Sequence, residues 1–548
     1  DDHTISGYRY STGWAKDQRV YFTAEFSKPF KSLAIYEGGE DGGLREGDSF
    51  RAERLYCRVG FDTSAGETIY VKVAISPVSI ENARLNMQAE LPGWDFEATA
   101  AAADRAWNAE LQKVRIETSD DAARRIFYTA LYHTMVAPSE FCDVNGDYRG
   151  SDGKIYRAAP FVNYTTFSLW DTYRAAQPLM TILHPEKMPD IANTMLHIYT
   201  QQGKLPVWHL AGNETDCMVG NPGIPALADA VLKGYGGFDR EQAYEALKQS
   251  AMLGERGMDL RMKYGYIPCD LFNEAVAYDM EYALADWAVA QVAKELGKTA
   301  DYDHFLERSK SYRHFFDPQT RFMRGLDSKG RFRTPFNPFR STHRADDYCE
   351  GNAWQYTWLV PHDVEGMVEL MGGREAVLRD LTEFFDKTPS DMLWNDYYNH
   401  ANEPVHLVPF LFNRLGQPWQ TQKWTRHICE KAYADKVEGI VGNEDAGQMS
   451  AWYVLAAAGL HPACPGDTRM EITSPVFDRI ELRLDPAYAP GGTFTVVAHG
   501  NSPSNVYIQR AVLNGREHTA SHLDFADIAA GGTLELYMGD TPNTRWGI

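Results

Sequence analysis

The sequence predicts a multidomain α+β protein that combines an N-terminal antiparallel β-sandwich, a central (α/α)6 toroid and a C-terminal β segment. Near the N-terminus apolar and polar residues alternate, which is typical of half-exposed strands. From Ser119 to about Leu460 the apolar residues recur with a helical period, and after Pro462 the alternation returns. With 548 residues the chain is also too long for one ordinary core, so several domains are expected.

Residues 1–90 are expected to form the N-terminal β-sandwich domain. Alternating side chains predict strands at 19–26 and 68–75. Because the first strand pattern begins without a capping element, we expect this sandwich to be truncated. Residues 91–118 are predicted to be linker helices, since the segment 96–107 is rich in alanine, the best helix former.

Residues 119–465 are expected to form the (α/α)6 barrel that would be the catalytic domain. About a dozen amphipathic segments follow one another, alternating between apolar and more charged types, and paired helices of this kind close into a toroid. An open α-solenoid is the alternative, but no internal repeat with a period of roughly 34 to 47 residues is present. Among the expected helices are 188–202, 278–297, 403–414 and 446–458.

Residues 466–548 are expected to form a C-terminal β domain. Alternating apolar residues recur in four short runs there, at 480–484, 493–498, 506–509 and 533–538. The predicted order along the chain is therefore β, helical barrel, β.

The composition excludes several classes of partner. A formal net charge of −21 argues against binding to a phosphate backbone, so no nucleic acid is expected. No apolar run approaches the roughly 18 residues that would predict a membrane span, and no signal peptide opens the sequence. The seven cysteines show no CxxC pair and no regular spacing, so we expect buried small apolar residues rather than a zinc site or a disulfide framework.

Two adjacent acids, Glu444 and Asp445, lie between Gly442 and Gly447 just before the helix expected at 446–458. Glycines permit a tight backbone approach, so this stretch is a good way to fix a carboxylate in place. Either acid could instead cap the helix, and capping is compatible with a catalytic role.

Glu350 is the second candidate acid, and it lies among the aromatic residues Tyr348, Trp354 and Trp358. Hydrolysis of a glycosidic bond needs one carboxylic acid to protonate the leaving oxygen and one carboxylate as base or nucleophile. An aromatic setting favours a protonated acid, so Glu350 and Asp445 are the leading pair. Alternatively, Glu350 caps the helix that follows it.

Three further stretches combine aromatic rings with polar groups, the mixture that a sugar-binding site requires. Trp170 and Asp171 are in the first, and plain core is the alternative for Trp170. The second runs from Trp208 through Glu214 to Cys217, and Trp208 has the same alternative. The third, 394–406, is rich in oxygen ligands.

In that third stretch Asn402, Glu403 and nearby carbonyl groups could hold a hard cation such as Ca²⁺. The spacing of the residues is not that of an EF-hand loop. An ordinary Asx turn and a helix start before Pro404 fit the same residues.

Together these stretches resemble glycoside hydrolase family 92, the calcium-dependent exo-α-mannosidases that invert the anomeric centre. The resemblance covers nearly the whole chain. Its six ordered motifs are 5–9 with Trp14, 168–174, 210–214, 350–356, 442–453 and 474–478.

The resemblance implies that Glu350 is the general acid and Asp445 the general base, with Glu444 or Asn443 helping to hold the attacking water. It also implies a Ca²⁺ ion close to the sugar. The implied metal ligands are Glu403, Asn402 and Gln355, and the implied substrate contacts are Trp170, Asp171, Trp208, Glu214 and Cys217.

The expected function is that of an inverting exo-α-mannosidase that hydrolyses terminal α-mannosides of N-glycans and other mannose-containing glycans. The resemblance implies a location outside the cytoplasm, in the periplasm or extracellular. The alternatives are another (α/α)6 glycosidase or a phosphorylase, an inactive glycan-binding homologue, and a structural scaffold. A phosphorylase would need a basic phosphate pocket, and the sequence shows no Lys or Arg cluster beside Glu350 or Asp445.

Overall fold

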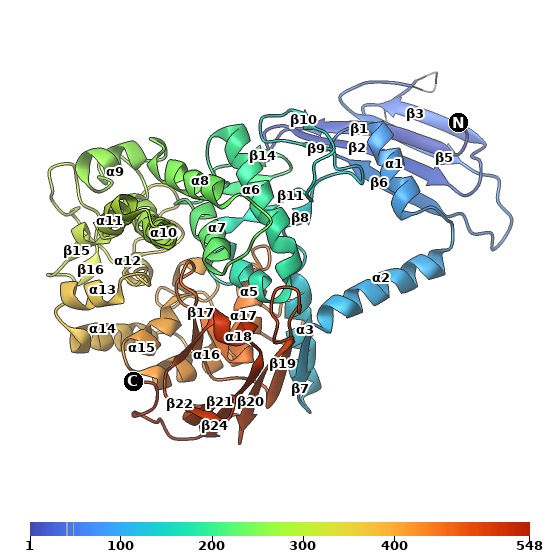
Figure 1. The fold of residues 1–548 in the computed structure, drawn as a ribbon. Helices are drawn as coiled ribbons and strands as arrows, with labels where there is room; N and C mark the ends of the chain where they lie inside the picture. The colour runs from blue at the N-terminus through green and yellow to red at the C-terminus, as the bar shows by residue number, and fades with distance from the viewer. Residues whose placement is uncertain (40–41, 46, 48) are drawn as a thin grey trace. The chain divides into compact units, whose positions relative to one another are not determined.

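The structure is a computed structural model that describes residues 1–39, 42–45, 47 and 49–548 (Figure 1). The chain forms two compact units. The first unit comprises 1–108, 141–160 and 211–213, and the second comprises 109–140, 161–210 and 214–548.

The first unit is built on two antiparallel sheets, each with three strands among the described residues. One has the order β1-β2-β6, and Phe22 pairs with both Gly7 and Ile75. The other has the order β4-β3-β5. The strands are β1 (Thr4–Ser11), β2 (Gln18–Phe26), β3 (Ser32–Glu37), β4 (Gly43–Arg45), β5 (Leu55–Gly60) and β6 (Val71–Ser76).

Two helices follow these sheets. Helix α1 (Ile80–Glu90) begins at Ser79, whose hydroxyl accepts the N–H of Asn82, and it packs against β6. Helix α2 (Phe96–Leu111) is the expected alanine-rich linker helix, and none of its described residues is buried. The short strands β9 (Tyr148–Arg149) and β10 (Ile155–Tyr156) complete the first unit.

The second unit is mainly helical. Its helices are α3 (Asp121–His133), α4 (Leu169–Thr172), α5 (Ala176–Leu183), α6 (Met188–Gln202), α7 (Gly223–Leu232), α8 (Arg240–Met252), α9 (Met258–Tyr264), α10 (Ala275–Glu295), α11 (Thr299–Arg308), α12 (Ala353–Tyr356), α13 (Val364–Leu370), α14 (Arg374–Asp386), α15 (Leu411–Arg414), α16 (Pro418–Lys431), α17 (Gln448–Ala458) and α18 (Phe525–Ala529). The 3₁₀ turns are η1 (Pro185–Lys187), η2 (Ser311–His314), η3 (Glu403–Val405) and η4 (Val408–Phe410).

The helical part of this unit closes on itself. Helix α17, the last of the series, packs against the first, α3, and also against α5 and α16. Helices α10 and α17 are buried on nearly every side, whereas α8 and α14 keep charged outer faces, so the unit contains both of the expected types of helix. The fold class predicted from the sequence is confirmed.

One helix prediction is confirmed in its bounds, and another is wrong because of two prolines. Helix α6 has the bounds expected for 188–202. The helix expected at 403–414 is instead broken into η3, η4 and α15. Pro404 and Pro409 lack the N–H that a continuous helix would need, so the chain turns in short steps there.

A sheet of six strands among the described residues closes the C-terminal part, in the order β22-β21-β24-β20-β19-β7. Strand β7 (Val114–Glu117) comes from the segment expected to be linker helix, and it pairs antiparallel with β19 (Arg479–Arg483). Val114 and Ile116 point to the same face because side chains alternate along a strand. The other strands are β20 (Thr493–His499), β21 (Tyr507–Leu513), β22 (Arg516–His518) and β24 (Gly532–Gly539).

The remaining strands of the chain are short. They are β8 (Ser139–Glu140), β11 (Tyr164–Thr165), β12 (Phe167–Ser168), β13 (Trp208–Leu210), β14 (Asn213–Glu214), β15 (Phe316–Asp317), β16 (Phe322–Met323), β17 (Leu460–Pro462), β18 (Arg469–Ile472) and β23 (His522–Asp524).

All seven cysteines are free thiols, and four of them, Cys269, Cys349, Cys429 and Cys464, are buried. Within the described ranges, no helix combines the length and the apolar character that crossing a bilayer requires.

Candidate active site

Three carboxylates from distant parts of the second unit meet at one point. Asp171 lies in α4, Glu403 opens η3, and Asp445 lies in the loop before α17. One oxygen of each side chain lies within 4.8 Å of the others. We call Asp171, Glu403 and Asp445 the carboxylate group.

A close backbone approach brings two of these segments together. Gly442 has a φ of 77°, and a Cβ atom there would lie 2.3 Å from the carbonyl oxygen of Ala401. Only glycine therefore lets the loop of Asp445 pass so near the segment of Glu403. Asp445 and Ala446 also have positive φ angles, 52° and 57°, which non-glycine residues adopt rarely and only where the surrounding structure holds them.

Glu403 is the most unusual member of the group. Its side chain is completely buried, and neither carboxylate oxygen has a hydrogen-bond partner among the described residues. Burial, followed by the negative charges of Asp171 and Asp445, raises the pKa of Glu403 well above its ordinary value. A buried carboxylate without a partner is costly, so this position calls for a cation or a proton.

The other two members are also shielded from water. Burial and the charge of Asp445 raise the pKa of Asp171, although the Ser168 hydroxyl donates a hydrogen bond to it. Burial, the charge of Glu350 and the charge of Glu444 raise the pKa of Asp445 to about 6. Three acids with raised pKa values that influence one another are typical of a functional site.

The donor set of the carboxylate group fits a hard cation. Ca²⁺ takes carboxylate oxygens as ligands, and each of the three residues offers one oxygen to the same point. A cation there would also compensate the two orphaned oxygens of Glu403. The residues present therefore fit the metal that the resemblance implies.

Two of the three predicted metal ligands have other partners in the structure. The Gln355 carboxamide accepts the N–H of Asn352 and donates to the carbonyl groups of Asn395 and Tyr397, so it belongs to the cap of α12. Asn402 donates to the backbone oxygen of Glu350 at 2.9 Å and to its Oε2 at 3.3 Å. Glu403 is thus the predicted ligand that the structure brings into the carboxylate group.

Glu350 lies beside this group rather than in it. Its side chain is partly exposed, its φ is 47°, and Asn402 holds both its backbone and its carboxylate. The next residue, Gly351, has no room for a side chain, because a Cβ would lie 2.9 Å from Oε1 of Gln355 and from the ring of Tyr356. Glu350 is therefore fixed at the surface of the site, where it can meet a substrate.

Glu444 and Asp445 separate into two roles. The Glu444 carboxylate accepts the N–H of Gly447 at 2.6 Å and that of Ser450 at 3.3 Å, so it caps the start of α17. Burial raises its pKa, and these hydrogen bonds oppose the rise. Capping by Glu444 leaves Asp445 as the acid of the pair that belongs to the carboxylate group.

The predicted substrate contacts lie in different surroundings. Trp170 is only 1% exposed and lies against the Arg174 guanidinium, and Trp208 is also buried. The Glu214 carboxylate accepts backbone N–H groups from Val207, Trp208 and Asp216, so it shapes its own loop.

Cys217 is the predicted contact that lies near the acids. Its thiol is half-buried and interacts electrostatically with Arg344, Glu350 and Asp171. Burial raises the pKa of this thiol, which disfavours its reactive thiolate form.

Sequence reasoning missed a set of residues that support the carboxylate group. Gln448 donates to Nδ1 of His406 at 3.1 Å and accepts the N–H groups of Ala175 and Ala176. Arg174 is fully buried and pairs with Glu281 of α10 at 2.7 Å. Gln448 directly precedes the apolar segment 449–458. A polar residue at such a position is the signal that could have identified Gln448 as a supporting residue.

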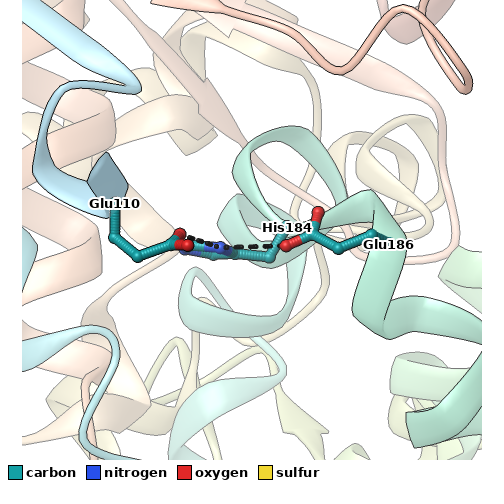
Figure 2. A group of neighbouring side chains, drawn as sticks. All are labelled: Glu110, His184 and Glu186. Carbon is teal, nitrogen blue, oxygen red and sulfur yellow. Dashed lines mark ion pairs between the residues drawn. The ribbon is translucent and has the colours of Figure 1, made fainter. Parts of the chain in front are cut away.

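A second cluster of possible ligands lies away from this site. Figure 2 shows Glu110, His184 and Glu186, with Nδ1 of His184 3.3 Å from Glu110 and 3.8 Å from Glu186. The ammonium group of Lys113 lies 2.8 Å from Glu110, 3.1 Å from Glu186 and 3.1 Å from His184. The ammonium group of Lys113 already balances the negative charge of these carboxylates, so the cluster is an ion-pair network and not a metal site.

The helical domain therefore presents an accessible acid, Glu350, beside a second, shielded acid, Asp445, whose pKa is raised to about 6. Such an acid and base are what the hydrolysis of a glycosidic bond requires. The class of protein that this fold and this site define is a glycoside hydrolase.

Comparison with known families agrees. The model of the glycosyl hydrolase family 92 catalytic domain matches residues 82–540, and that of the family 92 N-terminal domain matches residues 1–76. The chain belongs to glycosyl hydrolase family 92.

Several relatives resemble the chain over its whole length. The α-mannosidase BT3965 of Bacteroides thetaiotaomicron, in complex with mannoimidazole, is 38% identical with a TM-score of 0.93, covering 100% of this chain and 74% of that one. The inverting mannosidase BT2199 of the same organism is 32% identical with a TM-score of 0.91, covering 100% and 76%. An uncharacterized secreted glycosidase of Arthroderma benhamiae is 25% identical, covering 98% of this chain and 68% of the relative.

Proposed function

We propose that this protein is an inverting exo-α-mannosidase that hydrolyses terminal α-mannosides of glycans with the help of Ca²⁺. The observation that carries the proposal is the buried, unpartnered carboxylate of Glu403, which lies with Asp171 and Asp445 next to the accessible acid Glu350. Structural similarity supports the substrate class, since BT3965 is described as an α-mannosidase and BT2199 as an inverting mannosidase.

Glu350 is the general acid in this proposal. It would protonate the glycosidic oxygen as the bond from that oxygen to the anomeric carbon breaks, so the leaving sugar departs as a neutral alcohol. Asn402 holds the carboxylate through Oε2, which leaves the other oxygen, Oε1, to carry the proton to the substrate. The carbonyl group of Glu350 accepts from the same Asn402 amide, so the side chain and its backbone are fixed together.

Asp445 is the general base. It would take a proton from a water molecule that attacks the anomeric carbon from the face opposite the leaving group, which inverts the configuration. Only one of its oxygens belongs to the carboxylate group, so the other is available to that water.

Asp171, Glu403 and Asp445 would hold the Ca²⁺ ion. When bound, the ion would supply a positive charge that orients neighbouring hydroxyl groups of the mannose ring and favours its distortion. Arg174 supports this arrangement electrostatically, since its guanidinium, which pairs with Glu281, offsets part of the negative charge of Asp171 and Glu403.

We also place the enzyme outside the cytoplasm, where mannose-containing glycans are exposed to hydrolysis. The secreted glycosidase of Arthroderma benhamiae, which matches 98% of the chain, supports this location.

The proposal is tested by proton NMR of the first product released from α-mannobioses with added Ca²⁺. Initial appearance of β-mannose would support both the substrate class and inversion. Initial α-mannose would overturn inversion, and activity that needs inorganic phosphate would identify a phosphorylase. A protein that binds mannosides without releasing mannose would be a glycan-binding homologue, and full activity after chelation would rule out the role of Ca²⁺.

A further inference from the structure

A cavity of about 610 Å³ in the second unit lies next to the candidate acid. Its walls come from three segments, 215–218, 269–278 and 343–349. Cys349 lines the cavity, and it directly precedes Glu350 in the sequence. Its described lining does not include Asp171, Glu403 or Asp445, so the cavity is separate from the carboxylate group.

Cys217 connects this cavity to the acids. Its neighbours Asp216 and Met218 line the cavity, and its thiol interacts electrostatically with Arg344, Glu350 and Asp171. Arg344 also lines the cavity. A ligand whose bridging oxygen meets Glu350 can therefore extend toward Arg344.

The acids of the cavity already have partners in the protein. Asp216 pairs with Lys204 at 2.6 Å, Asp270 accepts from the Ser328 hydroxyl at 2.7 Å, and Glu274 accepts the backbone N–H of Arg344 at 3.2 Å. The Arg344 guanidinium, in contrast, is exposed and makes no ion pair with any described residue. It is the charged donor that the cavity leaves available.

The backbone around the cavity is held in unusual conformations. Four lining residues, Asp216, Met218, Glu274 and Arg344, have positive φ angles of 51°, 73°, 55° and 55°. Such conformations persist in non-glycine residues only where the surrounding structure holds them, and they cluster at binding sites. The hydrogen bond from the Arg344 N–H to the buried Glu274 is one such restraint.

We propose that this cavity binds the leaving-group sugar of the substrate, and that Arg344 determines specificity there by donating hydrogen bonds to adjacent hydroxyl groups. The proposal rests on the proposed function. A guanidinium presents several N–H donors in a fixed plane, which suits two neighbouring sugar oxygens. The rings of Phe272 and Tyr278 add aromatic surface, and the volume lies within the range of about 300–1,000 Å³ that small-molecule sites show.

The test compares Arg344→Ala with the wild type on α-mannobioses and on 4-nitrophenyl α-mannoside, whose leaving group is no sugar. We expect kcat/KM for the preferred mannobiose to fall about tenfold or more beyond any fall on the nitrophenyl substrate. Arg340→Ala is the matched control, because Arg340 is an exposed arginine of the same segment that does not line the cavity, and its kcat/KM values should stay within about twofold. Equal losses on both substrates, or no loss, would overturn the assignment.

A binding measurement separates failure of this assignment from failure of the proposed function. If the wild type releases no mannose from either substrate, the proposed function fails. Saturation-transfer NMR then compares mannobiose bound to the wild type and to Arg344→Ala. Loss of signal from the reducing sugar alone would support the cavity assignment, whereas unchanged signals would overturn it.

Discussion

The carboxamide of Gln448 donates to Nδ1 of His406 at 3.1 Å, and this one contact ties together two of the segments that build the site. His406 follows Glu403 by one turn, and Gln448 follows Asp445 by three residues. The carboxamide oxygen of Gln448 accepts the N–H groups of Ala175 and Ala176, just beyond Asp171. The buried side chain of Gln448 thus connects the three segments that contribute Asp171, Glu403 and Asp445.

Replacing Gln448 with alanine is expected to loosen the carboxylate group. It leaves the buried N–H groups of Ala175 and Ala176 without acceptors, so the free energy of unfolding should fall by about 2–4 kcal/mol. Calorimetric titration should show Ca²⁺ affinity lowered by about tenfold or more, because the supporting contacts of ligands govern metal affinity. Gln249→Ala, at an exposed position of α8, is the control. A stable variant with unchanged Ca²⁺ affinity would contradict the role of Gln448.

Glu403→Gln should affect the metal-free and metal-bound protein in opposite directions. Without metal, the glutamine removes a buried carboxylate that has no partner among the described residues, so the thermal midpoint should rise. With Ca²⁺, the wild type should gain stability as the ion binds the folded state, whereas the variant should gain little. Thermal unfolding in chelator and in Ca²⁺ measures both effects.

The exposed Glu430→Gln is the control for this experiment, and it should leave both midpoints near those of the wild type. A variant at Glu403 that is still stabilised by Ca²⁺ as strongly as the wild type would mean that the ion binds elsewhere.

Glu350→Gln and Asp445→Asn should differ in how they depend on the leaving group. A missing general acid matters only where the leaving oxygen needs a proton, so Glu350→Gln should lower kcat/KM about 10²–10⁴-fold on mannobioses and much less on dinitrophenyl α-mannoside. A missing base impairs the attack of water whatever the leaving group is, so Asp445→Asn should lower kcat/KM on both substrates. Steady-state kinetics with Glu375→Gln, an exposed position of α14, as control tests the two roles.

The sequence was sufficient for the parts of the site that depend on local geometry. Gly442 and Gly447 marked a constrained loop, and the loop does hold Asp445 by an approach that only glycine allows. The pattern of Asn352 and Gln355 was also a local signal, since an amide three residues after a helix cap is typical of a capping box. That signal would have argued against Gln355 as a metal ligand.

The sequence could not predict which acids meet, because that depends on packing between distant segments. Asp171, Glu403 and Asp445 are separated by hundreds of residues or by several helices, and their meeting follows from the closure of α17 onto α3 and α5. The same holds for β7, whose four residues give too little pattern to outweigh the helical composition before them. Only the partner strand β19 fixes its conformation.

The network of Glu110, His184 and Glu186 (Figure 2), together with Lys113, should stabilise the fold in a pH-dependent way. Contact with His184 lowers the pKa of Glu110 to about 2, and its contacts with His184 and Lys113 lower that of Glu186 to about 2 despite partial burial. Because these folded-state pKa values lie below the unfolded value of about 4.5, the stabilisation is complete above pH 5 and is lost as the pH falls from 4.5 toward 2.

The thermal midpoint of Glu186→Gln should therefore lie below that of the wild type at pH 6, and the difference should shrink by pH 3. The exposed Glu245→Gln should show no such convergence. A difference that stays constant with pH would mean that the network contributes through packing rather than charge.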